Sequence, residues 1–254
     1  MTPTLKGFGR QFTPWAIPSL ILLSWQILSW QGVIPSRILP APTAVFQAGV
    51  TLLSTGELYD HISISLWRAL AGFLIGGLIG FLLGLFNGIS RISELLFDTS
   101  IQMLRNIPHL ALIPLVILWF GIDEMSKIFL VALGVLFPIY INTYHGIKSV
   151  DKGLIEMGRA YGLRGAKLFF VIIFPGALSS ILVGVRFSLG VMWLTLIVAE
   201  TISAHSGIGY MAMNAREFMQ MDVIVLAIVL YALFGKLSDV IARYFENKWL
   251  RWNN

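Results

Sequence analysis

The chain alternates between long apolar runs and short polar segments. Runs with little or no charge occupy residues 11–36, 69–90, 106–122, 128–147, 168–199 and 223–244. The fifth run is interrupted only by Arg186, and the sixth is apolar as far as Lys236. Because a helix needs about 20 apolar residues to cross a bilayer, this pattern predicts an all-α integral membrane protein with six transmembrane helices.

The polar segments between these runs are short. The longest of them have the length of a loop or a surface helix and comprise residues 37–66, 148–167 and 200–222. Short interfacial helices are expected near 94–105 and 208–219. The run 106–122 is brief and carries Pro108 and Pro114 near its start, so we predict a helix that is broken at the membrane face.

The composition agrees with a bilayer as the main solvent. Hydrophobic residues make up 57% of the 254 residues and charged residues 12%, whereas soluble domains carry about 25% charged residues. The net charge of +5 is what an excess of Lys and Arg on cytoplasmic loops produces, so we expect no nucleic-acid partner. The chain has no cysteine, which excludes disulfides, thiol catalysis and cysteine-ligated metal, and its four histidines lack metal-site spacing. We therefore expect no metal site, and no motif points to catalytic residues.

The loop charges predict the orientation in the membrane. The first run follows Lys6 and Arg10 but is longer than the core of a signal peptide, which is about 7–15 residues, so we expect a retained helix. With the N-terminus inside, the inner cations are Lys6, Arg10, Arg91, Arg105, Lys148, Lys152, Arg159, Arg164, Lys167, Arg243, Lys248 and Arg251. The outer cations are then Arg37, Arg68, Lys127 and Arg216. By the positive-inside rule both termini are cytoplasmic.

Three patterns lie inside the predicted spans. Glycines recur every fourth residue at positions 72, 76, 80, 84 and 88, which favours close helix packing, with sliding during transport as the alternative. Lys236, Asp239 and Arg243 can pair along their own helix. Arg186 is the one charge deep in a span and needs a partner or water. It is therefore either a structural ion pair or a cation on the route of an anionic solute.

The inner loop 148–175 is amphipathic near its start. Leu154 and Ile155 alternate with charged residues, and Gly162 permits a sharp turn between two short helices. Pro175 opens the next span, where a missing N–H costs little. Such a hairpin is either a docking element or a solvated loop on the membrane.

The spacing within this loop resembles the "EAA" motif of binding-protein-dependent ABC importer permeases. Glu156, Gly162 six residues on, Ile172 ten residues further and Pro175 match its anchor positions. The resemblance implies a coupling helix that fits a groove on a cytoplasmic ATPase, with contacts from Glu156, Arg159, Ala160, Tyr161, Gly162 and Leu163. The sequence departs from the motif at Met157, Gly158 and Phe174; glycine at 158 is expected to weaken the helix by about 1 kcal/mol relative to alanine.

Longer stretches resemble the sulfonate, taurine and nitrate branch of that family. These stretches are residues 98–123, 128–147 and 184–218. The resemblance implies a type I ABC importer permease fold in the bacterial inner membrane, and aliphatic sulfonates as the solute, with taurine, nitrate or another small anion as the alternative. It also implies a homodimer, two ATPase subunits that bind ATP and Mg, a periplasmic binding protein, and no cofactor in this chain.

The same resemblance gives domain boundaries and a route for the solute. It implies an N-terminal helix with a periplasmic linker at 1–57, a permease core at 58–245 and a short cytoplasmic tail at 246–254. It places the fifth span at the dimer interface. Arg186 is then a candidate for attracting the solute, with Trp193 packing on its apolar part and Thr195 and Ser203 donating hydrogen bonds.

Two other classes fit the sequence less well. A secondary transporter is expected to carry acids or paired charges in mid-membrane, and the deep spans hold Arg186 without an acid. An intramembrane enzyme needs a nucleophile and a base on facing helices; His205 and Ser206 are sequence neighbours in an outer loop, and adjacent side chains of a helix do not face each other. The chain has no Walker A motif, so it is not expected to be an ATPase itself.

Overall fold

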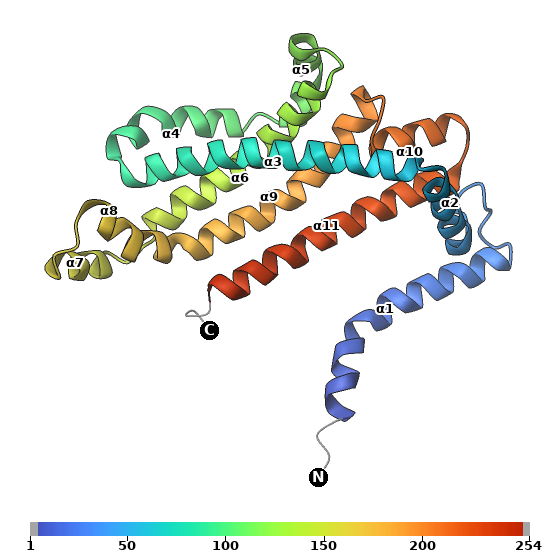
Figure 1. Ribbon diagram of the computed structural model, residues 1–254, viewed down its shortest axis with the longest axis horizontal. Coiled ribbons are helices and arrows are strands. Elements are labelled where there is room, and N and C mark those ends of the chain that lie inside the picture. The colour runs from blue at the N-terminus through green and yellow to red at the C-terminus, as the bar shows by residue number, and fades with distance from the viewer. Residues whose placement is uncertain (1–4, 251–254) are drawn as a thin grey trace. The chain divides into compact units, whose positions relative to one another are not determined.

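The computed structural model describes the backbone of residues 5–250 and the side chains of residues 16–250. Helices account for nearly all regular structure in this part of the chain (Figure 1). The side chains of Lys6 and Arg10, and Arg251, which enter the charge argument, lie outside the described residues. The all-α prediction is confirmed for the described residues.

The chain divides into two compact units. The first runs as far as His61 and takes in Met211–Val229, and the second comprises Ile62–Tyr210 and the chain from Leu230. In the first unit, α1 (Leu5–Trp30) and α2 (Pro42–Thr55) are joined by a side-chain contact, because the Gln26 amide group exchanges hydrogen bonds with Thr43.

The second unit is built on four long apolar elements. These are α3 (Glu57–Ile89), α6 (Glu124–Lys148), the continuous stretch Gly165–Ser203 and α11 (Met221–Trp249), of which α3 and α11 extend into the first unit. The stretch Gly165–Ser203 combines α8 (Gly165–Leu168), a π-helical turn at Phe169–Ile173 and α9 (Phe174–Ser203). Each of the four is long enough to cross a bilayer.

The run 106–122 is not one helix. A 3₁₀ turn at His109–Leu112 leads into α5 (Ile113–Phe120), and together they bend by 80° from α4 (Arg91–Arg105). This bent pair is a fifth span or a re-entrant segment, and Ala16–Trp30 is the apolar part of α1 whose side chains the structure describes. Short helices are present at the two positions predicted for interfacial helices, as α4 and α10 (Ile208–Glu217).

The glycine stripe of α3 packs against α6. A Cβ atom added at Gly84 would lie 2.6 Å from the Tyr140 carbonyl oxygen, and one at Gly76 would collide with the backbone at Ala132. Glycine therefore lets the two helix backbones approach closely, which is the main source of packing energy between helices in a bilayer. The packing interpretation of the stripe is confirmed.

Helices α6 and α9 pack against each other along much of their length. Along the ribbon they run side by side, and the inner loop closes them at the end where α6 stops and α9 begins (Figure 1). Ile147 and Ala177 are buried together near this end, and Leu130 and Ala199 near the other. The inner loop is therefore attached to the packed ends of α6 and α9.

Candidate functional site

The inner loop begins with a short capped helix, α7 (Lys152–Ala160). The Asp151 carboxylate accepts a hydrogen bond of 2.8 Å from the Gly153 N–H, which satisfies one of the free donors at the helix start. The helix then ends in a Schellman motif. The Leu163 N–H donates to the Gly158 carbonyl (2.9 Å) and the Gly162 N–H to the Arg159 carbonyl (3.0 Å).

Gly162 makes this turn possible. Its φ of 83° lies in the left-handed region, where a side chain with a Cβ is strained. The chain reverses here and enters α8 only three residues later. The sequence analysis predicted a glycine turn between two short helices at this position, and the geometry agrees with it.

Gly158 has a packing role that the sequence analysis missed. It is buried, and a Cβ atom at this position would collide with the side chains of Ile172 and Leu168. The missing side chain lets α7 lie directly on the π-helical turn that follows α8. Glycine at 158 weakens α7 as an isolated helix. Because it has no side chain, it also allows α7 to pack closely on the segment just before α9.

The outer side of the loop is apolar at three positions. Leu154, Met157 and Tyr161 are 47%, 50% and 83% exposed. They lie at i, i+3 and i+7, on one face of α7 and its C-cap. Glu156, Arg159 and Ala160 are also exposed, whereas Leu163 is half-buried under α7. The hairpin thus presents an apolar stripe with charged edges, which is suited to protein contact.

The four candidate pathway residues lie on different sides of α9. Arg186 and Trp193 both face α11: the Arg186 guanidinium donates to Asp239 at 2.6 Å, and the Trp193 indole N–H donates to Ser238 at 2.9 Å. Trp193 also stacks on Phe234 and is buried. The two residues are seven positions apart and lie on the same face of α9.

Thr195 and Ser203 point into the second unit. The Thr195 hydroxyl lies 3.0 Å from His109 Nε2, and the Ser203 hydroxyl donates to the Ala199 carbonyl at 3.0 Å. Both side chains are buried. In this conformation the four residues do not line one surface, and Arg186 is the one that remains partly exposed.

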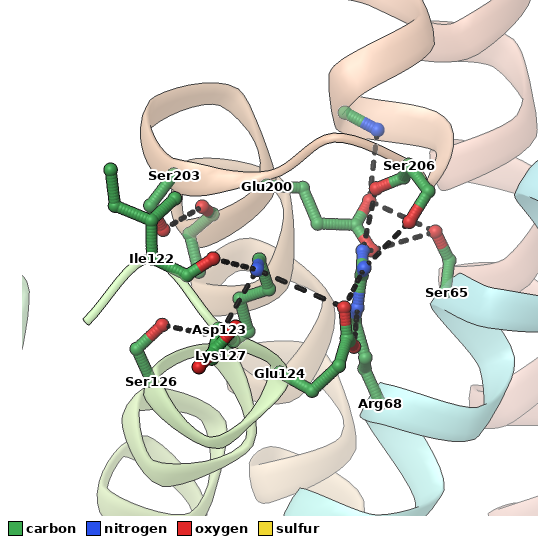
Figure 2. Close-up of polar contacts among 12 residues, drawn as sticks. Ser65, Arg68, Ile122, Asp123, Glu124, Ser126, Lys127, Glu200, Ser203 and Ser206 are labelled. Atoms are coloured by element: carbon green, nitrogen blue, oxygen red, sulfur yellow. Dashed lines mark hydrogen bonds and ion pairs between the residues drawn. The ribbon is translucent and has the colours of Figure 1, made fainter. Parts of the chain in front are cut away.

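A buried charge cluster lies at the other end of the unit, where α6 begins and α9 ends (Figure 2). All five N–H groups of Arg68 are used: two donate to Glu124, one to Glu200, and two to the carbonyl and hydroxyl oxygens of Ser206. The Glu200 carboxylate also accepts from Ser65, the Gly209 N–H and the Tyr231 hydroxyl. Such a fully paired cluster fixes α3, α6, α9 and α11 to one another.

This cluster corrects two assignments. The loop charges predict that Arg68 is an outer cation, yet its side chain lies within α3 and is fully buried. Acids or paired charges in mid-membrane are expected of a secondary transporter, yet Arg68 and Glu200 form a buried pair between two long helices of this chain. The spacing of Ser65 and Arg68, one helical turn apart ahead of an apolar run, was the available signal for a polar face of α3 that needed partners.

Comparison with known proteins decides the family. Residues 76–251 match the family described as binding-protein-dependent transport system inner membrane component. The chain belongs to this family. It is therefore a permease of the inner membrane, and the secondary-transporter alternative is excluded.

The alignments with curated relatives extend over nearly the full length of this permease. It is 64% identical to the putative aliphatic sulfonates transport permease protein SsuC of Escherichia coli (strain K12), over 100% of this chain and 96% of the relative. It is 44% identical to the protein of the same name from Bacillus subtilis (strain 168), over 98% and 92%. The taurine transport system permease protein TauC of Escherichia coli (strain K12) is 32% identical, over 92% and 87%.

Solved structures share the fold of the permease. A chain of an amino acid ABC transporter aligns with a TM-score of 0.64 at 17% identity, covering 78% of this chain and 97% of that one. A chain of the inward-facing MetNI methionine ABC transporter aligns with a TM-score of 0.55 at 18% identity, covering 77% and 97%. The fold is that of an ABC transporter permease.

Proposed function

We propose that this permease is the membrane subunit of an ATP-driven importer that carries aliphatic sulfonates across the inner membrane. The observation that carries the proposal is the 64% identity, over the full chain, to a relative named as an aliphatic sulfonates permease. The taurine permease at 32% identity makes taurine, itself a sulfonate, the second candidate. Nitrate or another small anion follows from the sequence resemblance alone.

We propose that α7 and the Gly162 turn dock on the ATPase subunit. The support is the exposed apolar stripe of Leu154, Met157 and Tyr161, held on a capped and tightly turned hairpin. Tyr161, at the tip, is the proposed anchor, because a rigid aromatic side chain brings large contact area at low entropic cost. Glu156, Arg159, Ala160 and Leu163 are the proposed flanking contacts.

The assembly that we propose contains two copies of this permease, two ATPase subunits and a periplasmic binding protein that delivers the solute. ATP and Mg are bound by the ATPase subunits, and this chain needs no cofactor of its own. Support comes from the family, whose description names binding-protein dependence, and from structural neighbours that are themselves parts of ABC transporters.

The proposed topology has six transmembrane segments with both termini in the cytoplasm. The four long apolar helices and the bent pair supply five, and α1, with its apolar part Ala16–Trp30, is the sixth. The excess of cations on the inner segments supports the orientation. The proposed divisions remain an N-terminal helix and linker at 1–57, a permease core at 58–245 and a tail at 246–254.

Arg186 is the proposed cation of the solute route, since it is the partly exposed member of the four candidates. Trp193, Thr195 and Ser203 are turned into the subunit. Their direct contact with a solute requires α9 to separate from its neighbours, so we propose it for other stages of the transport cycle.

Uptake of labelled solutes tests the proposed function. Cells that lack their own sulfonate importers and express this permease with its cognate ATPase and binding protein are given labelled ethanesulfonate, taurine or nitrate. ATP-dependent uptake of ethanesulfonate in excess of the other two is expected. The control is the same cells with an ATPase that cannot hydrolyse ATP. Uptake of nitrate alone would contradict the sulfonate assignment.

A further inference from the structure

A groove of about 480 Å³ runs between α9 and α11 on the exposed side of the Arg186–Asp239 pair. We call it the α9–α11 groove. Its walls are mostly apolar, with Val183, Phe187 and Leu194 exposed on α9. Arg186 and Leu194 are eight residues apart, which is about 12 Å along a helix. The groove thus combines a charged pair near one end with an apolar wall beyond it.

Two glycines line this groove, and the space next to each of them is empty. Gly190 and Gly235 both line it, and a Cβ atom added to either would meet nothing within 4 Å. From residue 16 onward, the other helical glycines with an ordinary φ have neighbours at that distance. Packing within the described chain therefore explains glycine elsewhere but not at these two positions. Glycine at such a site leaves room for a ligand or for a close backbone.

Arg186 and Asp239, which line the groove, belong to a linked group of charges with an excess of positive charge. Asp239 is paired with Arg186 (2.6 Å), Arg243 (3.0 Å) and Lys236 (3.6 Å), and Glu246 lies 3.7 Å from Arg186. Three cations and two acids in this linked group give 3 − 2 = +1. One bound monoanion would neutralise the group.

Two charges of this group are exposed within the described chain, and one of them lies far from either end of α11. The side chains of Lys236 and Arg243 are 63% and 55% exposed. Lys236 is fifteen residues from the first residue of α11 and thirteen from the last, so it lies near the middle of the helix. Charged groups at such depth avoid acyl chains and face water or protein. This side of α11 therefore borders an aqueous space or another chain.

We propose, building on the proposed function, that the α9–α11 groove binds an amphipathic monoanion of the alkanesulfonate type on its way through the permease. The sulfonate oxygens accept hydrogen bonds from Lys236 and Arg186 at the charged end. The alkyl chain lies over Gly190 and Gly235, against Phe187 and Leu194. The glycines thus set the length of chain that the groove accepts.

The proposed position of the alkyl chain is tested by replacing the two glycines of the groove with larger residues. Gly190→Leu and Gly235→Leu place a side chain in open space at a helical backbone, so both variants are expected to insert and fold. Labelled methanesulfonate and hexanesulfonate are bound to the permease–ATPase complex in nanodiscs of phosphatidylcholine. Affinity for hexanesulfonate is expected to fall about fourfold for each methylene that is displaced, while affinity for methanesulfonate stays within about twofold. The matched control is Ala232→Leu, an exposed position of α11 outside the groove.

The proposed position of the sulfonate group is tested by removing the charge of one lysine. Lys236→Gln keeps hydrogen-bond donors at similar size, and Asp239 retains Arg186 and Arg243 as partners. Affinity for both sulfonates is expected to fall by a similar factor, about tenfold or more, because the head group is common to them. Lys248→Gln, near the end of α11, is the control and should leave both affinities unchanged.

Other results would overturn the proposal. If the glycine variants bind both sulfonates as the unsubstituted complex does, the groove does not hold the tail. If they instead break the complex into single permeases, the glycines serve contact with a second copy. If native mass spectrometry finds an anionic phospholipid that is lost in Lys236→Gln and the leucine variants, the occupant is a lipid. Binding needs no uptake, so failure of sulfonate uptake alone would contradict the proposed function and not this site.

Discussion

Arg68 and Glu200, which are 132 positions apart in the chain, form an ion pair of 2.8 Å in which neither side chain is exposed. The pair joins α3 to the last turn of α9. Ser206, just beyond α9, accepts two further hydrogen bonds from the same guanidinium. A single side chain therefore holds the end of α9 and the following turn in place.

Loss of this arginine should destabilise the permease strongly. Arg68→Met leaves the buried Glu200 carboxylate without its cation, and breaking a buried pair on one side costs about 3–5 kcal/mol. The measurement is thermal unfolding of the purified permease in detergent. Arg37→Met, at an exposed position, is the control and should unfold like the unsubstituted protein. Equal unfolding temperatures for the two variants would show that the cluster contributes little.

Coupling to ATP hydrolysis should depend on the conformation of Gly162. Gly162→Val forces a β-branched residue into a φ of 83°, which strains the Schellman turn and tilts the hairpin. Solute-stimulated ATP hydrolysis by the assembled complex is expected to fall about tenfold or more, with insertion retained.

Gly162→Asn is the matched control for that variant. Asparagine tolerates the left-handed region better than other residues and should retain most of the activity. If Gly162→Val hydrolysed ATP at the unsubstituted rate in an intact complex, the loop would not be the coupling element.

The role of Arg186 can be separated from its ion pair. Arg186→Gln leaves Asp239 paired with Arg243 and Lys236, so assembly of the complex is expected to persist. Uptake of alkanesulfonate should fall by about tenfold or more, as a charged hydrogen-bond donor is lost from the route. Size-exclusion chromatography and uptake are measured together. Loss of assembly would assign a structural role, and intact uptake would remove Arg186 from the route.

The topology can be tested by labelling single-cysteine variants, because the chain has no cysteine of its own. Glu57→Cys and Arg164→Cys both replace exposed residues. A membrane-impermeant maleimide added to intact spheroplasts should label position 57 and reach position 164 only after lysis. The reverse pattern would invert the orientation and place the docking hairpin on the wrong side for a cytoplasmic ATPase.

The sequence predicted those features of the fold that depend on residues close to one another in the chain. The glycine stripe from 72 to 88 predicted a close helix contact because its period matches one face of a helix. Gly162 was identifiable as a turn because it interrupts an amphipathic stretch. Gly158 was misjudged, since its propensity is visible in the sequence but its neighbours Ile172 and Leu168 follow only after the chain has reversed.

The sequence by itself determined the membrane class, the four long helices, the glycine turn of the inner loop and, through motif spacing, the family. These depend on apolar length, charge bias and residues near one another in the chain. Only the tertiary structure decided that Arg68 meets Glu200, that Asp239 pairs with Arg186, and that Gly190 and Gly235 open on one groove. Such pairings join helices that are far apart in sequence, and no local rule specifies which faces of those helices will meet.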